Sequence, residues 1–203
     1  FAEARYEHGA RLLVAAGVRA EHIAREALAG APGGFSPRPD FPRDVVTSLN
    51  PKLSASWVLR PMSSPRGAST RVKLNAGTGI RPPDAFEIAF TDNAGLKPER
   101  SRSLDAGVEQ ALAGGRVILD ATWFANRYDD LIVAVGPAFA DASRYRTDNI
   151  SNARARGVEL SGAVRLPAGL SVRAGYTHLR TEIRAVDGGT RAPPPSTGGQ
   201  PLP

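Results

Sequence analysis

The chain contains no cysteine, one methionine and two tryptophans among its 203 residues. The absence of cysteine excludes disulfides, thiolate metal sites and cysteine nucleophiles. No apolar run approaches the roughly 20 residues that a membrane-spanning helix needs. The three histidines, His8, His22 and His178, are too scattered in the sequence to indicate a metal site. We therefore expect no metal site. We also expect no cofactor, and we name no catalytic residue.

Charge of one sign is not concentrated anywhere in the chain. Lysine and arginine total 26 against 20 acidic residues, for a net charge of +6, and the two signs are interspersed throughout. Without a basic run, and with too few aromatic side chains to stack on bases, the sequence argues against nucleic-acid binding. The pair Gly77-Thr-Gly79 lacks the third glycine and the following helix of a phosphate-binding loop.

What the sequence does contain is regular alternation, clearest in the stretch from Thr70 to Glu109. Successive side chains of a strand point to opposite faces. One face of the first strand carries Thr70, Val72, Leu74, Ala76, Thr78 and Ile80, and the other carries Arg71, Lys73, Asn75, Gly77, Gly79 and Arg81. A soluble sheet turns such an apolar face inward, whereas a membrane barrel turns it outward to lipid.

The same pattern recurs along the chain and predicts about eight strands. We expect them at residues 2–8, 11–25, 45–60, 70–80, 101–112, 116–134, 149–166 and from 170 onward. Residues 21–29 also have helix-favouring composition, but the regular alternation before them favours a strand. Pro51 lies on the apolar face of its strand and removes one ladder donor, which predicts a bulge or a weak point there.

The lengths of the connections favour the membrane interpretation. Short connections (8–10, 61–69, 113–115, 167–169) alternate with long ones (about 26–44, 81–100, 136–148, 185–203). Up-and-down membrane barrels sort their loops in this way. Many strands also exceed the 9–11 residues that cross a bilayer, whereas soluble strands average about 5–6. The sequence therefore predicts an all-β, antiparallel up-and-down transmembrane β-barrel segment that is incomplete, with the four long connections as external loops.

Specific motifs then suggest a family. The stretch Gly77-Thr-Gly-Ile-Arg-Pro-Pro83, followed by Leu96-Lys-Pro-Glu-Arg-Ser101, resembles the barrel of TonB-dependent outer-membrane receptors. Weaker matches to the same family are Glu87, Gly107-Val-Glu109, Tyr128 to Ile132, Asn152-Ala153, Gly157-Val-Glu159 and Gly169 to Leu179, so that the resemblance covers most of residues 45–184. The sequence departs from the family pattern where Asn93-Ala94 replaces Asn-Pro and Ile80 replaces an aromatic residue.

The resemblance implies a fragment of a larger transporter. Plugged transporters have about 22 strands, so residues 1–203 would form a partial barrel without its plug, and both ends of the chain are expected to be cuts. The intact protein would import a ferric siderophore, cobalamin or a similar large, scarce ligand across the outer membrane of a Gram-negative bacterium, without enzymatic chemistry. Its implied partners are its own plug, the remaining barrel strands, the TonB energy complex acting through the plug, outer-membrane lipid and lipopolysaccharide.

Candidate residues follow from this interpretation. Ligand contacts are expected from the loop cations Arg81, Lys97, Arg144 and Arg146, and plug contacts from the wall residues Arg71, Lys73, Asn75, Asp105, Glu109 and Glu159. The loop cations, with Arg38, Arg43, Arg100 and Arg191, could equally pair with lipopolysaccharide phosphates or simply solubilise the loops. Trp57 and Tyr128 are predicted to lie at the bilayer interface, which aromatic residues favour.

Two alternatives remain open at the level of sequence. The chain could be a small stand-alone structural barrel of about eight strands, or a soluble β domain that binds or processes carbohydrate. We expect the isolated fragment to be insoluble or misfolded, because open sheet edges in lipid leave backbone groups unpaired.

Overall fold

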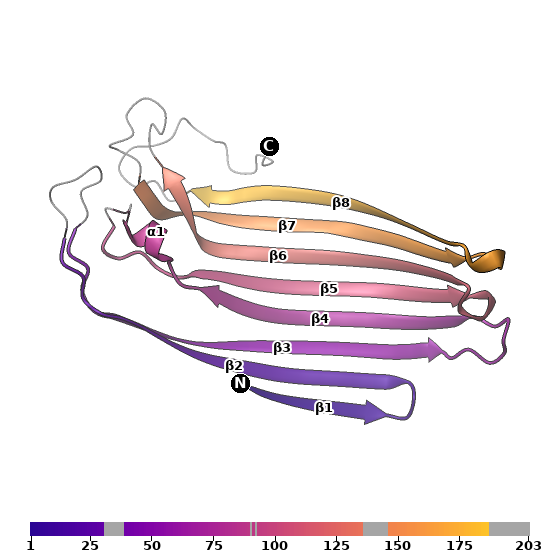
Figure 1. The fold of residues 1–203 in the computed structure, drawn as a ribbon. Helices are drawn as coiled ribbons and strands as arrows, with labels where there is room; N and C mark the ends of the chain where they lie inside the picture. The colour runs from indigo at the N-terminus through magenta and orange to yellow at the C-terminus, as the bar shows by residue number, and fades with distance from the viewer. Residues whose placement is uncertain (31–38, 90, 92, 136–145, 187–203) are drawn as a thin grey trace.

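The computed structural model contains one antiparallel sheet of eight strands, in the spatial order β1 to β8 (Figure 1). It describes residues 1–30, 39–89, 91, 93–135 and 146–186. Every strand pairs with its neighbour in the sequence, which is the up-and-down topology that the sequence predicts. The prediction of an incomplete, all-β barrel segment of eight long strands is therefore confirmed.

The strands agree closely with the segments predicted from alternation. They are β1 (Ala2–His8), β2 (Leu12–Arg25), β3 (Asp44–Arg60), β4 (Ser69–Arg81), β5 (Glu99–Leu112), β6 (Val117–Val135), β7 (Arg146–Arg165) and β8 (Ser171–Val186). Two 3-10 turns, η1 (Ala113–Gly115) and η3 (Pro167–Gly169), join strands at the end with short connections, on the right of Figure 1. Within the described residues, the segment that the sequence analysis left as a loop between β4 and β5 contains the short helix α1 (Ala85–Ala89).

Cross-strand pairing places most of the apolar side chains of the strands on one face. One row across the sheet, for example, joins Leu12, Trp57, Val72, Val108, Ala121, Leu160 and Tyr176. These side chains are largely solvent-exposed, with Trp57 at 54% and Tyr176 at 62%. Such exposure is costly in water, since each large apolar side chain left unburied forgoes about 1.5–3 kcal/mol. The face therefore needs an apolar environment.

The buried side chains do not form a core beneath the strands. Among the described residues, the largest fully buried side chains are Phe41, Leu96 and Thr91, and all three lie in the connections at the long-loop end. A soluble sandwich or barrel would instead bury the apolar face of each strand. This distribution argues against the soluble β alternative. In a barrel segment, an exposed apolar face of this kind is the outward surface and the polar face is the inward surface.

Pro51 marks a division in the sheet. The ladder between β3 and β4 runs from Arg60 only as far as the pair Lys52 and Gly77. The next pair would place Pro51 opposite Thr78, and proline has no backbone N–H to donate. The ladder between β2 and β3 continues past Pro51, as far as Arg25 and Asp44. The predicted weak point is thus the site where the β2–β3 arm separates from β4.

One prediction about the aromatic residues is wrong. Trp57 lies on the outward face, as expected for a residue at the bilayer interface. Tyr128, however, lies opposite Ser101 and Ala153 on the polar face, and is therefore inward-facing. Its proximity to a long loop suggested the bilayer interface, but the strand parity, which runs unbroken from Val117, excludes it.

Candidate functional site: the polar wall and the loop cluster

The inward face of the sheet forms a charged wall. Arg71 on β4 forms an ion pair of 3.6 Å with Glu109 on β5. Lys73 reaches across β5 to contact the carboxylate of Asp120 on β6. Such pairs along a half-exposed wall each contribute little stability, at most about 1 kcal/mol. Their effect is instead to keep the wall polar and hydrated.

The remaining predicted wall residues lie on the same face. Asn75 is directly opposite Asp105 on β5, and Glu159 is opposite Thr122 on β6 and Thr177 on β8. Parity along each strand was enough to place all six candidates together, because the period of a strand is two residues. Contact between this wall and a plug domain stays a prediction.

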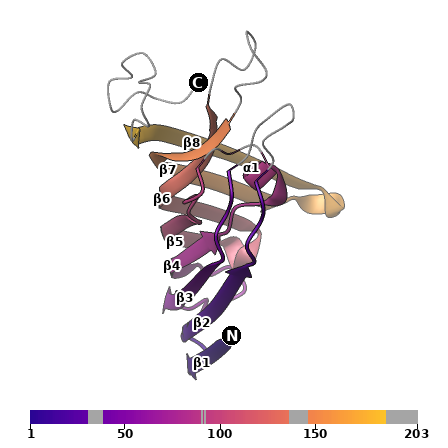
Figure 2. The same ribbon diagram turned by 90° about the vertical axis from the view of Figure 1, so that its left-hand side faces the viewer.

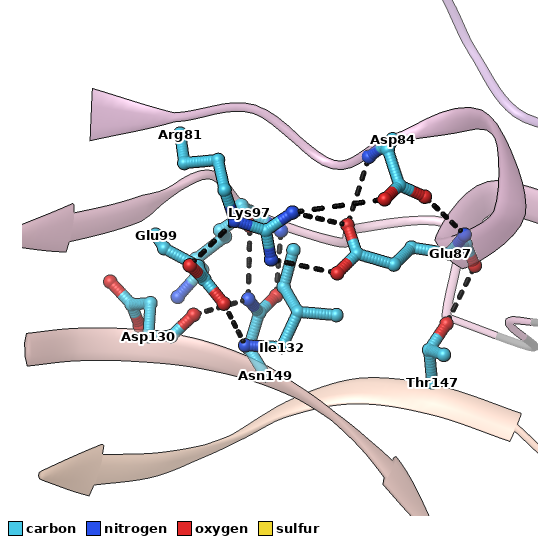
Figure 3. Close-up of polar contacts among 9 residues, drawn as sticks. All are labelled: Arg81, Asp84, Glu87, Lys97, Glu99, Asp130, Ile132, Thr147 and Asn149. Carbon is cyan, nitrogen blue, oxygen red and sulfur yellow. Dashed lines mark hydrogen bonds and ion pairs between the residues drawn. The ribbon is translucent and has the colours of Figure 1, made fainter.

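A second polar cluster forms where β4 and β5 end, around Arg81 (Figure 3). The guanidinium of Arg81 donates through Nε to Glu99 at 2.7 Å and through Nη2 to Glu87 at 2.7 Å. Glu99 also accepts a hydrogen bond of 2.9 Å from the backbone N–H of Ile132 on β6. Arg81 thus joins the end of β4 to β5 and to the helix α1, on the inward face of the sheet.

The helix α1 is positioned by its own capping residues. The Asp84 carboxylate accepts from the backbone N–H of Glu87 at 2.8 Å, and the Glu87 carboxylate accepts from the N–H of Asp84 at 2.8 Å. This reciprocal arrangement is a capping box, which satisfies two helix-terminal donors. The Glu87 carboxylate therefore binds both the first turn of α1 and the guanidinium of Arg81. The orientation of the helix thus depends on the end of β4, which carries Arg81.

The loop that follows α1 is attached to the beginning of β7. Thr147 donates to the backbone oxygen of Glu87 at 2.6 Å, and Thr91 donates to the backbone oxygen of Thr147 at 2.6 Å. Farther along, Asn149 accepts from the N–H of Lys97 at 2.6 Å and donates to its carbonyl oxygen at 2.9 Å (Figure 3). These bonds join segments more than 50 residues apart. These bonds therefore attach the described part of the connection between β4 and β5 to the start of β7.

Mutual hydrogen bonding shifts the pKa values in the cluster. Desolvation by burial alone would raise the pKa of Glu99, but the hydrogen bonds from Arg81 and from the Ile132 N–H outweigh it and lower the pKa. The same contacts with Glu99 and Glu87 raise the pKa of Arg81. The cluster lies closer to the long connections than the outward-facing pair of Arg102 and Arg127, and so outside the part of the sheet whose outward side chains are apolar. Both groups remain ionised at neutral pH.

This shift predicts how the loop responds to acid. Because the pKa of Glu99 is lowered in the folded state, its contribution is present above the ordinary value of 4.5 and is lost as the pH falls through the lowered value. We expect the segment between Arg81 and Glu99 to keep its amide protection from pH 7 to pH 4.5 and to lose it only in stronger acid. Hydrogen exchange corrected for intrinsic rates measures this, and release centred above pH 4.5 would contradict it.

A hollow of about 410 Å³ lies where the β2–β3 arm separates from the rest of the sheet. Its cationic lining residues are Arg25, Arg43, Lys97 and Arg100, and its acidic ones are Asp44 and Asp130. Arg25 lies 3.8 Å from the Asp44 carboxylate and stacks on the ring of Phe41, but its buried Nε has no hydrogen-bond partner. The hollow is therefore a net positive concavity at the long-loop end.

Of the four predicted ligand-binding cations, the described part of the structure includes the side chains of two, Arg81 and Lys97. Lys97 lines the hollow, whereas Arg81 is occupied by two carboxylates. Arg146 begins β7, but its side chain and the whole of Arg144, Arg38 and Arg191 lie outside the described residues. Within the described ranges, no three His, Asp or Glu side chains lie close enough to hold a metal ion, and no helix is long and apolar enough to cross a membrane.

Residues 1–203 match a family model described as "TonB dependent receptor-like, beta-barrel". The chain belongs to the TonB-dependent receptor family. Members of this family are receptors and transporters of the outer membrane. No curated protein sequence matches the chain.

Several solved structures share the fold of this receptor segment. The FrpB iron transporter from Neisseria meningitidis (F3-3 variant) matches with a TM-score of 0.64 and 17% identity, over 91% of this chain and 25% of that chain. The RagAB peptide transporter matches with a TM-score of 0.67 and 12% identity, over 98% and 24%. The alcaligin outer membrane receptor FauA from Bordetella pertussis matches with a TM-score of 0.57 and 18% identity, over 98% and 30%. The receptor segment thus spans about a quarter of the length of these structures.

Some residues of the receptor's loop cluster were not anticipated from its sequence. The capping box was detectable, because an acidic residue followed three positions later by glutamate, as in Asp84-Ala-Phe-Glu87, is a helix-start signal. The contacts of Thr91, Thr147 and Asn149 were not, since they depend on which segments of two distant connections meet. No local spacing in the sequence encodes such a meeting.

Proposed function

We propose that this chain is part of the barrel of an outer-membrane receptor that imports a large, scarce ligand, such as a ferric siderophore or cobalamin, with energy from the TonB complex. The observation that supports this most directly is the sheet with one exposed apolar face and one charged face, in a chain of the TonB-dependent receptor family. Lipid would cover the first face, and the hydrated lumen with its plug would meet the second.

In this proposal the polar inward face contacts the plug. The wall formed by Arg71, Lys73, Asn75, Asp105, Glu109 and Glu159 would hold the plug through polar contacts. Hydrated, half-exposed ion pairs are individually weak, so a plug held by them can rearrange when the TonB complex pulls on it. No bond in the ligand is made or broken, so the chain needs no catalytic residue.

The loop cluster would present the external surface to the ligand. Arg81 and its two carboxylates fix the β4–β5 connection on the inward side of the sheet, and Lys97 lines the net positive hollow beside it. Anionic ligands are attracted to such a concavity over long range. We propose Lys97, Arg144 and Arg146 as ligand contacts, with Arg81 as the residue that positions the loop.

Uptake by the intact receptor tests the function. Deleting the gene for the intact protein is expected to abolish accumulation of one labelled ferric siderophore or of labelled cobalamin, and a plasmid copy is expected to restore it. Loss of TonB should remove the same uptake, because the energy comes from the inner membrane. Unchanged uptake of every candidate ligand would contradict transport, and recovery of the protein in the soluble fraction would contradict the membrane location as well.

A further inference from the structure

On the outward face of strands β5 to β8, the apolar residues end abruptly toward the long connections. On β6, outward residues are apolar from Val117 to Ala125, a span of about 30 Å at ~3.3 Å per residue, or about 23 Å in height at a tilt of ~40°. This matches the apolar band of about 25 Å that barrels present to lipid. The next outward residue toward the long loops is Arg127.

Arginines continue directly above this limit on all four strands. The outward positions are Arg102 on β5, Arg127 on β6, Arg154 and Arg156 on β7, and Arg180 on β8; we call these five residues the arginine patch. Three pairs are direct cross-strand neighbours: Arg102 with Arg127, Arg127 with Arg154, and Arg156 with Arg180. All five side chains are at least partly exposed.

The patch has too few carboxylates of its own. Arg127 pairs with Asp129 at 2.8 Å. Glu182 is opposite Arg154, but its ion pair is with Arg184, at 3.6 Å. Within the part of the chain that the structure describes, the other four arginines form no ion pair. Like charges directly opposite each other in a sheet are destabilising, so the patch requires anions from another molecule.

The patch is also confined to one side of the segment. Among β1 to β4, cross-strand pairing places one arginine outward, Arg60, and it lies opposite Thr70 near the end with short connections. At the height of the patch, β4 carries Thr78 and Ile80 instead. Charges that merely kept the barrel rim hydrated would be distributed around it. Arg100, one pair above Arg102, also faces outward but lines the hollow described above.

From this arrangement we propose that the arginine patch is a binding site for the phosphate groups of a lipid in the leaflet on the long-loop side. A lipid whose acyl chains lie along the apolar band has its phosphates at the height at which the arginines begin. A guanidinium binds two phosphate oxygens at once, and arginine retains its charge at any physiological pH. The proposal names the residues that would make the lipopolysaccharide contact expected from the sequence. It rests on the proposed function, in which the apolar face lies in lipid.

The test uses the intact receptor, purified in a neutral detergent and stripped of lipid. Bis-phosphorylated lipid A and its dephosphorylated form are the probes, and retained lipid is counted by native mass spectrometry. We expect preferential retention of the phosphorylated form. The double substitution Arg156→Gln and Arg180→Gln should weaken retention at least about tenfold, because each basic residue near a charged lipid surface contributes about 1 kcal/mol.

The matched control removes the same charge from the inward face. Lys52→Gln with Arg173→Gln changes two inward-facing cations that form no ion pair among the described residues, and it should leave retention unchanged. Arg156→Lys with Arg180→Lys keeps the charge but loses the two-oxygen geometry, so it should retain more lipid than the glutamine variant and less than the unaltered receptor. The heat-dependent shift in gel mobility verifies that each variant is folded. Equal loss in the control, or no preference for the phosphorylated probe, would overturn the proposal. Failure of the receptor to fractionate with outer membranes would instead overturn the proposed function.

Discussion

Replacing Gly157 with alanine is expected to prevent strands β7 and β8 from pairing and to remove the intact receptor from the outer membrane. A Cβ atom at this position would lie 2.1 Å from the backbone oxygen of His178 and 2.7 Å from Cζ of Phe124. The His178 oxygen belongs to the adjacent strand, so it cannot move without opening the β7–β8 ladder. We expect a cost at or above the upper end of the 1–3 kcal/mol that overpacking usually imposes.

Gly175 provides the control for this substitution. It lies on the same inward face, on β8, and a Cβ there would meet only the Leu160 oxygen at 3.8 Å, an ordinary contact. Gly175→Ala should therefore leave the folded yield unchanged, as measured by outer-membrane abundance and heat-dependent gel mobility. Wild-type abundance of Gly157→Ala would show that the ladder tolerates the displacement.

Replacing Arg81 with methionine is expected to release the β4–β5 connection and weaken ligand binding without unfolding the barrel. The substitution leaves Glu87 and Glu99, whose side chains are only 13% and 16% exposed, without their shared cation. A hydrogen bond to a charged group contributes about 1.5 kcal/mol or more, so amide protection in the connection should fall at least about tenfold. Hydrogen exchange measures the protection, and equilibrium binding measures the ligand affinity.

The matched control is Arg71→Met, which removes the same charge from the same face of β4 and breaks the 3.6 Å pair with Glu109. Because Arg71 is far from α1 along the strand, the control should leave protection in the connection unchanged. If both variants lose protection equally, the effect comes from the loss of a positive charge on the inward face and not from the contacts of Arg81. If neither does, Arg81 does not position the loop.

The strands were predictable because their pattern is local. In β4, polar and apolar residues alternate without exception from Val72 to Asn75, and cross-strand pairing preserves that order over the neighbouring strands. In β6 the inward residues Ile118 and Phe124 obscured the pattern. Phe124 lies against Gly157, which leaves room for its ring, and this complementarity between strands is invisible in either strand alone.

Residues near strand ends were harder to place. The β6–β7 register shifts between Tyr128 and Leu131, where Asp130 adopts a positive φ of 58°, so parity counted from the loop side is misleading. The inward direction of Tyr128 follows only from counting up from Val117. The wall candidates, which all lie inside regular strands, did not suffer from this difficulty, whereas the loop candidates depended on conformations that alternation does not determine.

The single missing donor at Pro51 has a further consequence for cooperativity. Beyond Lys52, β3 keeps only β2 as a ladder partner, and a two-stranded ribbon is barely stable alone. The arm therefore forms a separate unfolding unit, whose opening free energy is lower than that of β5 to β7, which have ladder partners on both sides. We therefore expect one imino acid in the middle of a strand to lower the local stability of the rim without lowering that of the wall below it.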